Sequence, residues 1–86
     1  MVPFVVERTF PSALTEEELE ATGKRMAPCL ELHRVRYIRS FWSADRRRMI
    51  CHYEAPDAEA VREVQRESGA LFDTVWAATI IGETAG

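Results

Sequence analysis

The sequence has 86 residues, a net charge of −3 and a pI of about 5.3. This length predicts one domain over residues 1–86, and 47% hydrophobic residues argue against disorder. The acidic balance argues against nucleic-acid binding, and no apolar run is long enough to cross a membrane. The start of the chain does not read as a signal peptide. With two cysteines and no CxxC motif, we expect a cytoplasmic protein with reduced thiols.

The first half of the chain predicts a strand and then a helix. Val and Phe are frequent over residues 2–10, as in a strand. Thr15 and Glu18 have the spacing of a capping box, so a helix should begin after Thr15. Pro28 predicts an end or a kink of this helix near Ala27.

The second half predicts a hairpin, a helix and a last strand. Strands over residues 35–42 and 48–54 flank a short turn. Asp57 should cap a helix that runs to about Ser68 and ends at Gly69. A fourth strand is expected over 74–81, and 82–86 should be a frayed tail. This order predicts an α+β, ferredoxin-like βαββαβ fold: a four-stranded antiparallel sheet with two helices on one face.

Alternation along the strands predicts an apolar patch on the uncovered face of the sheet. A two-residue hairpin turn at 45–46 would pair Arg39 with His52, Ser40 with Cys51 and Ile38 with Tyr53. An exposed apolar patch marks an interface, so we expect a homodimer through the open sheet face, forming a dimeric α+β barrel. The predicted members of the patch are Val5, Tyr37, Phe41 and Ile50.

Four polar side chains, Glu7, Arg39, His52 and Glu54, are predicted on the same face. One interpretation is a salt-bridged network, which would fit a non-catalytic interaction module. A second is a metal site in which Glu7, His52 and Glu54 bind nickel or another divalent transition metal. A third is a cofactor-independent oxygenase or isomerase for a small anionic or aromatic substrate, in which Arg39 holds the substrate and His52 or Glu54 moves a proton. None of these requires an organic cofactor.

Two further residues receive structural interpretations. His33 lies just before the second strand and is predicted to be a surface histidine. Cys51 is predicted to face inward as an unreactive thiol, because a reactive thiol needs a cationic neighbour.

The order of several motifs resembles a family of small bacterial domains of formerly unknown function, some of which are described as nickel-binding proteins. The resemblance covers about residues 2–81 and implies a ferredoxin-like fold, a homodimer and nickel binding. Members often have His or Glu in place of Arg39 and an aliphatic residue in place of His52. Here His52 would either replace the missing ligand or form an anion-binding pair with Arg39. The segments that carry the resemblance are 4–10, 15–19, 35–41, 51–57, 61–63, Gly69 and 73–75.

Overall fold

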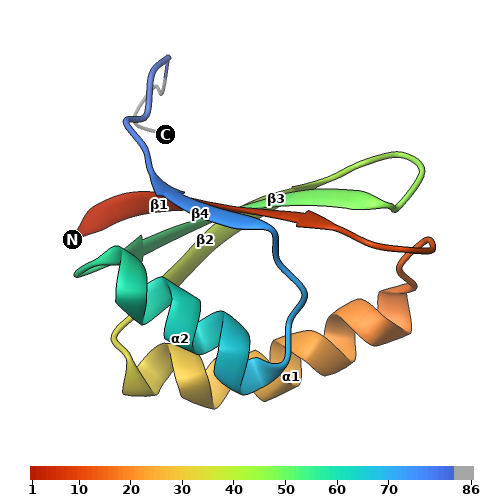
Figure 1. The fold of residues 1–86 in the computed structure, drawn as a ribbon, viewed down its shortest axis with the longest axis horizontal. Coiled ribbons are helices and arrows are strands. Elements are labelled where there is room, and N and C mark those ends of the chain that lie inside the picture. The colour runs from red at the N-terminus through yellow and green to blue at the C-terminus, as the bar shows by residue number, and fades with distance from the viewer. Residues whose placement is uncertain (83–86) are drawn as a thin grey trace.

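The computed structural model describes residues 1–82 as a four-stranded antiparallel sheet with both helices on one face (Figure 1). The elements follow the order β1 (Val2–Thr9), α1 (Glu16–Leu32), β2 (Arg36–Trp42), β3 (Arg48–Ala55), α2 (Ala58–Ser68) and β4 (Thr74–Ala77). The strands lie side by side as β2-β3-β1-β4. The predicted ferredoxin-like βαββαβ fold is therefore confirmed. The predicted tail falls largely on residues 83–86, which lie outside the described residues.

The helix boundaries follow from their capping residues. At α1, Thr15 Oγ1 accepts from the Glu18 amide at 3.1 Å, and the Glu18 carboxylate accepts from the Thr15 amide at 2.9 Å. At α2, Asp57 accepts from the Ala60 amide, and Gly69 ends the helix with a φ of 74°. Glycine adopts this left-handed conformation without steric cost. No helix within residues 1–82 is long and apolar enough to cross a membrane.

Three local expectations were wrong. Of the end or kink predicted near Ala27, the end is not found: α1 continues through Pro28 to Leu32, because an isolated missing N–H is tolerated where tertiary packing holds the following turn. The fourth strand ends at Ala77 instead of residue 81. Its pairing stops because the Ala78 amide already donates to Pro3 O near the beginning of β1, so little partner strand is left.

The third correction concerns the register of the hairpin. Arg39 does pair with His52, and Ser40 with Cys51, as predicted. A β-bulge between Tyr37 and Arg39 then shifts the register, so that Tyr37 instead of Ile38 lies opposite Tyr53. A bulge adds one residue to one strand and reverses the faces beyond it. Tyr37 therefore lies on the helical side, with its ring 5.7 Å from that of Tyr53.

The core lies between the helices and one face of the sheet. Alternate residues of β1 and β3 are buried, and α2 contributes its apolar stripe. The buried core residues of these three elements are Phe4, Val6, Met49, Cys51, Tyr53, Ala55, Val61 and Val64. The same alternation places the charged residue Arg8 in this layer, where it is only 6% exposed.

Candidate functional site

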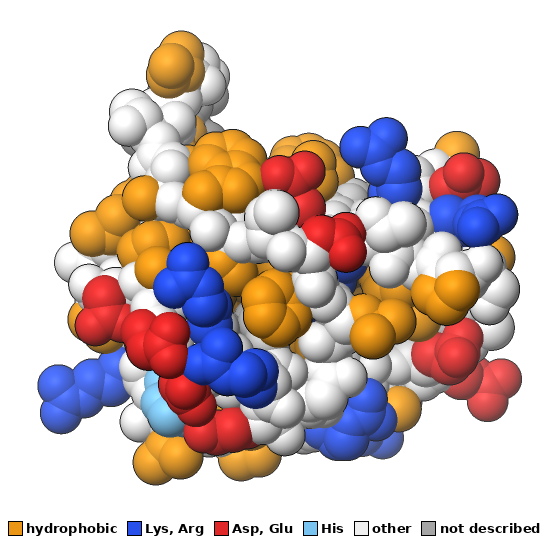
Figure 2. All heavy atoms as spheres, viewed as in Figure 1, with side chains coloured by type: hydrophobic (Ala, Val, Ile, Leu, Met, Phe, Trp, Pro, Cys, Tyr) orange, Lys and Arg blue, Asp and Glu red, His pale blue; other side chains and the backbone are white. Residues whose placement is uncertain are grey.

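The uncovered face of the sheet carries an apolar patch, much as the sequence predicts. Figure 2 shows hydrophobic side chains on the side of the sheet opposite the helices. Phe41 lies opposite Ile50, and Trp76 lies opposite Val5. Phe41 is 66% and Trp76 47% exposed, which is unusual for side chains of this size. We call Val5, Phe41, Ile50 and Trp76 the open-face patch; the bulge removes Tyr37 from it.

The three residues predicted to bind metal on this face are not gathered within one chain. Glu7 lies opposite Ile50 and accepts hydrogen bonds from Trp76 Nε1 at 2.7 Å and Thr74 Oγ1 at 3.2 Å. Glu54 lies opposite Pro3, four positions along β1, and pairs with Arg36 at 3.7 Å. Four positions at about 3.4 Å per residue separate the backbones of Glu7 and Glu54 by more than 10 Å along the strands. The set Glu7, His52 and Glu54 therefore remains a prediction that needs a second chain.

The pair Arg39 and His52 has the predicted register, with both residues on the open face. His52 Nε2 is buried and has no hydrogen-bond partner among residues 1–82. Buried polar atoms nearly always have a partner in native proteins. Within one chain this nitrogen is an exception to that rule.

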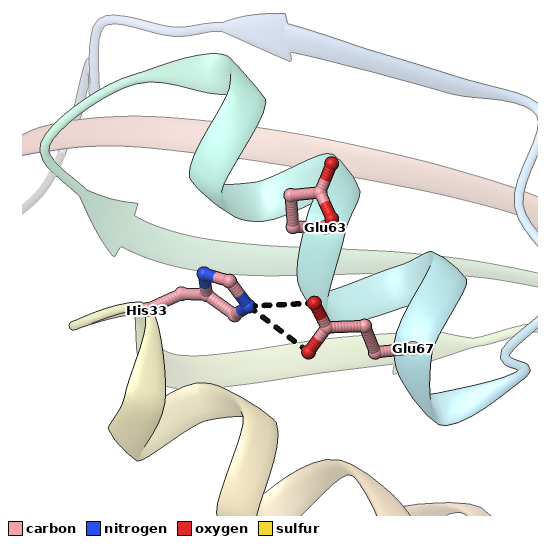
Figure 3. A group of neighbouring side chains, drawn as sticks. All are labelled: His33, Glu63 and Glu67. Atoms are coloured by element: carbon pink, nitrogen blue, oxygen red, sulfur yellow. Dashed lines mark hydrogen bonds and ion pairs between the residues drawn. The ribbon is translucent and has the colours of Figure 1, made fainter.

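A different set of side chains does converge, where the end of α1 meets α2. His33 follows the last turn of α1, and its Nε2 lies 3.0 Å from both carboxylate oxygens of Glu67 on α2. Glu63 lies one turn earlier on the same helix face (Figure 3). One ligand atom from each residue lies within 4.8 Å of the others, and within residues 1–82 this is the only such trio of His, Cys, Asp or Glu. We call it the His33 cluster.

A neighbouring arginine, Arg66, keeps the Glu63 carboxyl of the cluster ionised. Arg66 hydrogen bonds with Glu63 and also with Glu59, at 2.7 Å. The bond and charge of Arg66 lower the pKa of the Glu63 carboxyl below its ordinary value, so this carboxylate is ionised near neutral pH. One imidazole and two carboxylates suit nickel, zinc, cobalt or iron. A bound ion would have to share Glu63 with Arg66.

Sequence reasoning identified His33 only as a surface residue and did not select Glu63 or Glu67. The two glutamates are four residues apart on a predicted helix, which places them on one face. That spacing was visible in the sequence. The approach of His33 depends on the packing of α1 against α2, which the sequence alone does not define.

Comparison with known proteins identifies the family of this fold. A family model described as nickel responsive protein SCO4226-like matches residues 4–77. The chain belongs to the SCO4226-like family. No curated protein is significantly similar to it. The resemblance inferred from the motif order is thereby confirmed, and the family description points to a role connected with nickel.

A solved structure of this family agrees with the architecture. The crystal structure of SCO4226 from Streptomyces coelicolor A3(2) superimposes with a TM-score of 0.80 and covers 91% of this chain and 96% of that chain. The two sequences are 18% identical. At this identity the comparison supports the fold, while the ligands must be argued from this chain's own residues.

Proposed function

We propose that this member of the SCO4226-like family is a nickel-binding protein whose metal is held by the His33 cluster. The observation that supports this most is the convergence of one imidazole nitrogen and two carboxylates from two helices. Ni²⁺ accepts imidazole and carboxylate ligands together. Nε2 of His33 and one oxygen each from Glu63 and Glu67 would bind the ion, leaving its other positions to water or to a second chain.

The chain has only two histidines, so single variants can separate the two candidate sites. Isothermal titration with Ni²⁺ should show saturable binding by the wild type. His33→Gln should weaken it by about tenfold or more, because an imidazole ligand is lost. His52→Gln is the matched control and should leave it unchanged. Loss of binding in His52→Gln with retention in His33→Gln would refute the His33 cluster and assign nickel to the open face; no binding by the wild type would refute the function.

Glu67→Gln tests the second ligand. It preserves the shape of the side chain but removes the charge that balances the metal, so nickel affinity should fall as in His33→Gln. Glu20→Gln, at an exposed position of α1 paired with Lys24, is the control for a general loss of negative charge. Equal effects of the two variants would show that nickel is attracted by net charge alone.

We also propose that the protein is a homodimer joined through the open-face patch. Exposed Phe41, Ile50 and Trp76 on one sheet face are costly in water and typical of an interface. His52, whose Nε2 has no hydrogen-bond partner among residues 1–82, lies on the same face. In such a dimer Glu7, His52 and Glu54 from the two copies could approach one another. The predicted open-face metal site would therefore require the dimer.

Sedimentation velocity at micromolar concentration tests this assembly. We expect a dimer for the wild type and a monomer for Phe41→Glu, which places a charge at the most exposed side chain of the patch. Leu32→Glu, on the helical layer and similarly exposed at 72%, should remain dimeric. A monomeric wild type, or dissociation by Leu32→Glu instead of Phe41→Glu, would contradict the proposed interface.

A further inference from the structure

A cavity of about 760 Å³ lies between α1 and the helical side of the sheet, away from both candidate nickel sites. Its wall is mostly apolar, with Leu19 and Met26 from α1 and Trp42 and Met49 from the hairpin. Small-molecule sites are typically cavities of about 300–1,000 Å³ with apolar walls and a few placed polar groups. The polar groups that line this cavity therefore decide what it could bind.

The principal polar group is Arg8, a buried charge without an acidic partner. Its guanidinium donates to Tyr53 Oη at 2.9 Å, to the Leu71 carbonyl at 2.9 Å and to Cys51 Sγ at 3.4 Å. Among residues 1–82 no carboxylate forms an ion pair with it. A buried cation is costly unless an anion compensates it.

Tyr53 does not supply that anion. Burial of its hydroxyl raises its pKa to about 12, against the opposing attraction of Arg8. The phenol therefore stays neutral; it accepts from Arg8 and donates to Met26 Sδ. A guanidinium has five N–H groups, and the three bonds above leave one on each terminal nitrogen for a further acceptor.

Two further features belong to the same cavity. Trp42 is one of its lining residues, and its Nε1 is buried without a hydrogen-bond partner among the described residues. Gly23 of α1 also lines the cavity, and a Cβ built on it meets no atom within 4 Å. The cavity thus combines an uncompensated cation with open space beside a helix.

We infer that this cavity binds a small organic monocarboxylate with an aromatic or aliphatic body. The carboxylate would accept hydrogen bonds from the two unused N–H groups of Arg8 and would supply the missing negative charge. Guanidinium and carboxylate match as bidentate partners. The apolar body would occupy the space between Leu19, Met26 and Met49. Exposed Glu18 and Arg25 also line the cavity and are the other charges that an entering acid would meet.

The test uses naphthoate and its neutral analogue naphthamide, observed through the indole N–H signals of the two tryptophans by NMR. Binding of naphthoate should shift the Trp42 signal and leave that of Trp76, which donates to Glu7 on the opposite face, unchanged. Naphthoate should bind about tenfold or more tightly than naphthamide because of its charge. A shift of Trp76 instead of Trp42, or equal affinities, would overturn the assignment.

Arg8→Met should abolish the preference for the acid while still binding the amide. Gly23→Leu should fill the cavity and weaken both ligands, which tests the site even if Arg8→Met does not fold. Arg36→Gln, on the exposed edge strand, is the control and should bind as the wild type does. Sulfate provides the charge without the apolar body: if it shifts Trp42 as strongly as naphthoate at equal concentration, the site binds inorganic anions and the inference is wrong.

Discussion

Removal of the Tyr53 hydroxyl should change how the stability of the protein depends on pH. Tyr53 is 1% exposed, and its Oη accepts from Arg8 and donates to Met26. Tyr53→Phe keeps the ring but leaves the buried guanidinium with one partner fewer. Since hydrogen bonds to charged groups contribute about 1.5–3 kcal/mol, the variant should be less stable by about that amount at pH 7.

The alkaline range provides the sharper test. The pKa of Tyr53 is raised from 10.0 to about 12 in the folded protein. Above about pH 10 the unfolded chain therefore loses this proton while the folded chain keeps it, so stability falls as pH rises. Integrated to about pH 12, the loss is on the order of 2–3 kcal/mol. Tyr53→Phe has no such proton to lose, so its disadvantage should shrink across this range.

Urea unfolding of both proteins from about pH 8 to 12 measures the difference directly. The chain has only two tyrosines, so Tyr37→Phe is a natural control. Tyr37 is 49% exposed, and its variant should keep the wild-type decline in stability. Parallel stability curves for wild type and Tyr53→Phe throughout the alkaline range would refute the account of a neutral, buried Tyr53 beside Arg8.

Three further substitutions test the local structure by thermal or urea unfolding. Thr15→Ala removes the hydroxyl that accepts from the Glu18 amide and should cost about 1 kcal/mol, while no loss would mean that α1 begins independently of its cap. Gly23→Ala should stabilise by about 1 kcal/mol, since alanine favours a helix and its Cβ meets open space. Gly69→Ala should destabilise by about 1–2 kcal/mol because its φ is 74°. If the two glycine variants shifted stability in the same direction, the backbone argument would fail.

Predictions that rest on neighbouring residues agree with the structure. The spacing of Thr15 and Glu18 correctly located the start of α1, and Asp57 with Gly69 located both ends of α2. These signals depend on hydrogen bonds between residues three or four positions apart, so they can be read without knowing the fold. Pro28 was misleading because the missing hydrogen bond is local whereas the packing that sustains α1 is not.

The candidate site was harder to predict because its residues meet through helix packing. Glu7, His52 and Glu54 were correctly assigned to one sheet face, but alternation alone gives no distance along the strands. His33 approaches Glu67 only because α1 packs against α2. Arg8 could have been found: it follows Phe4 and Val6 at a spacing of two, which predicts an inward charge.

The β-bulge between Tyr37 and Arg39 interrupts the alternation of side chains between the two sheet faces, and it lies beside the cavity. Had the strand been regular, Ile38 would face Tyr53 and this part of the wall would be apolar. The bulge instead brings Tyr37 inward, where its hydroxyl lies 2.8 Å from Ser40 Oγ, and Ser40 donates to Cys51 Sγ at 3.1 Å. Cys51 in turn accepts from Arg8, so this buried thiol does have the cationic neighbour that the sequence did not reveal.

These contacts form a continuous polar strip from Tyr37 through Ser40, Cys51 and Arg8 to Tyr53, along one wall of a mostly apolar cavity. A core designed only for stability would favour apolar residues here, because buried charges seldom add net stability. Bulges are frequent beside functional sites, where they redirect a side chain, and local rules tend to be broken where function requires it. The departure from regular strand geometry and the uncompensated Arg8 therefore both fit the inferred role of this cavity in binding an anion.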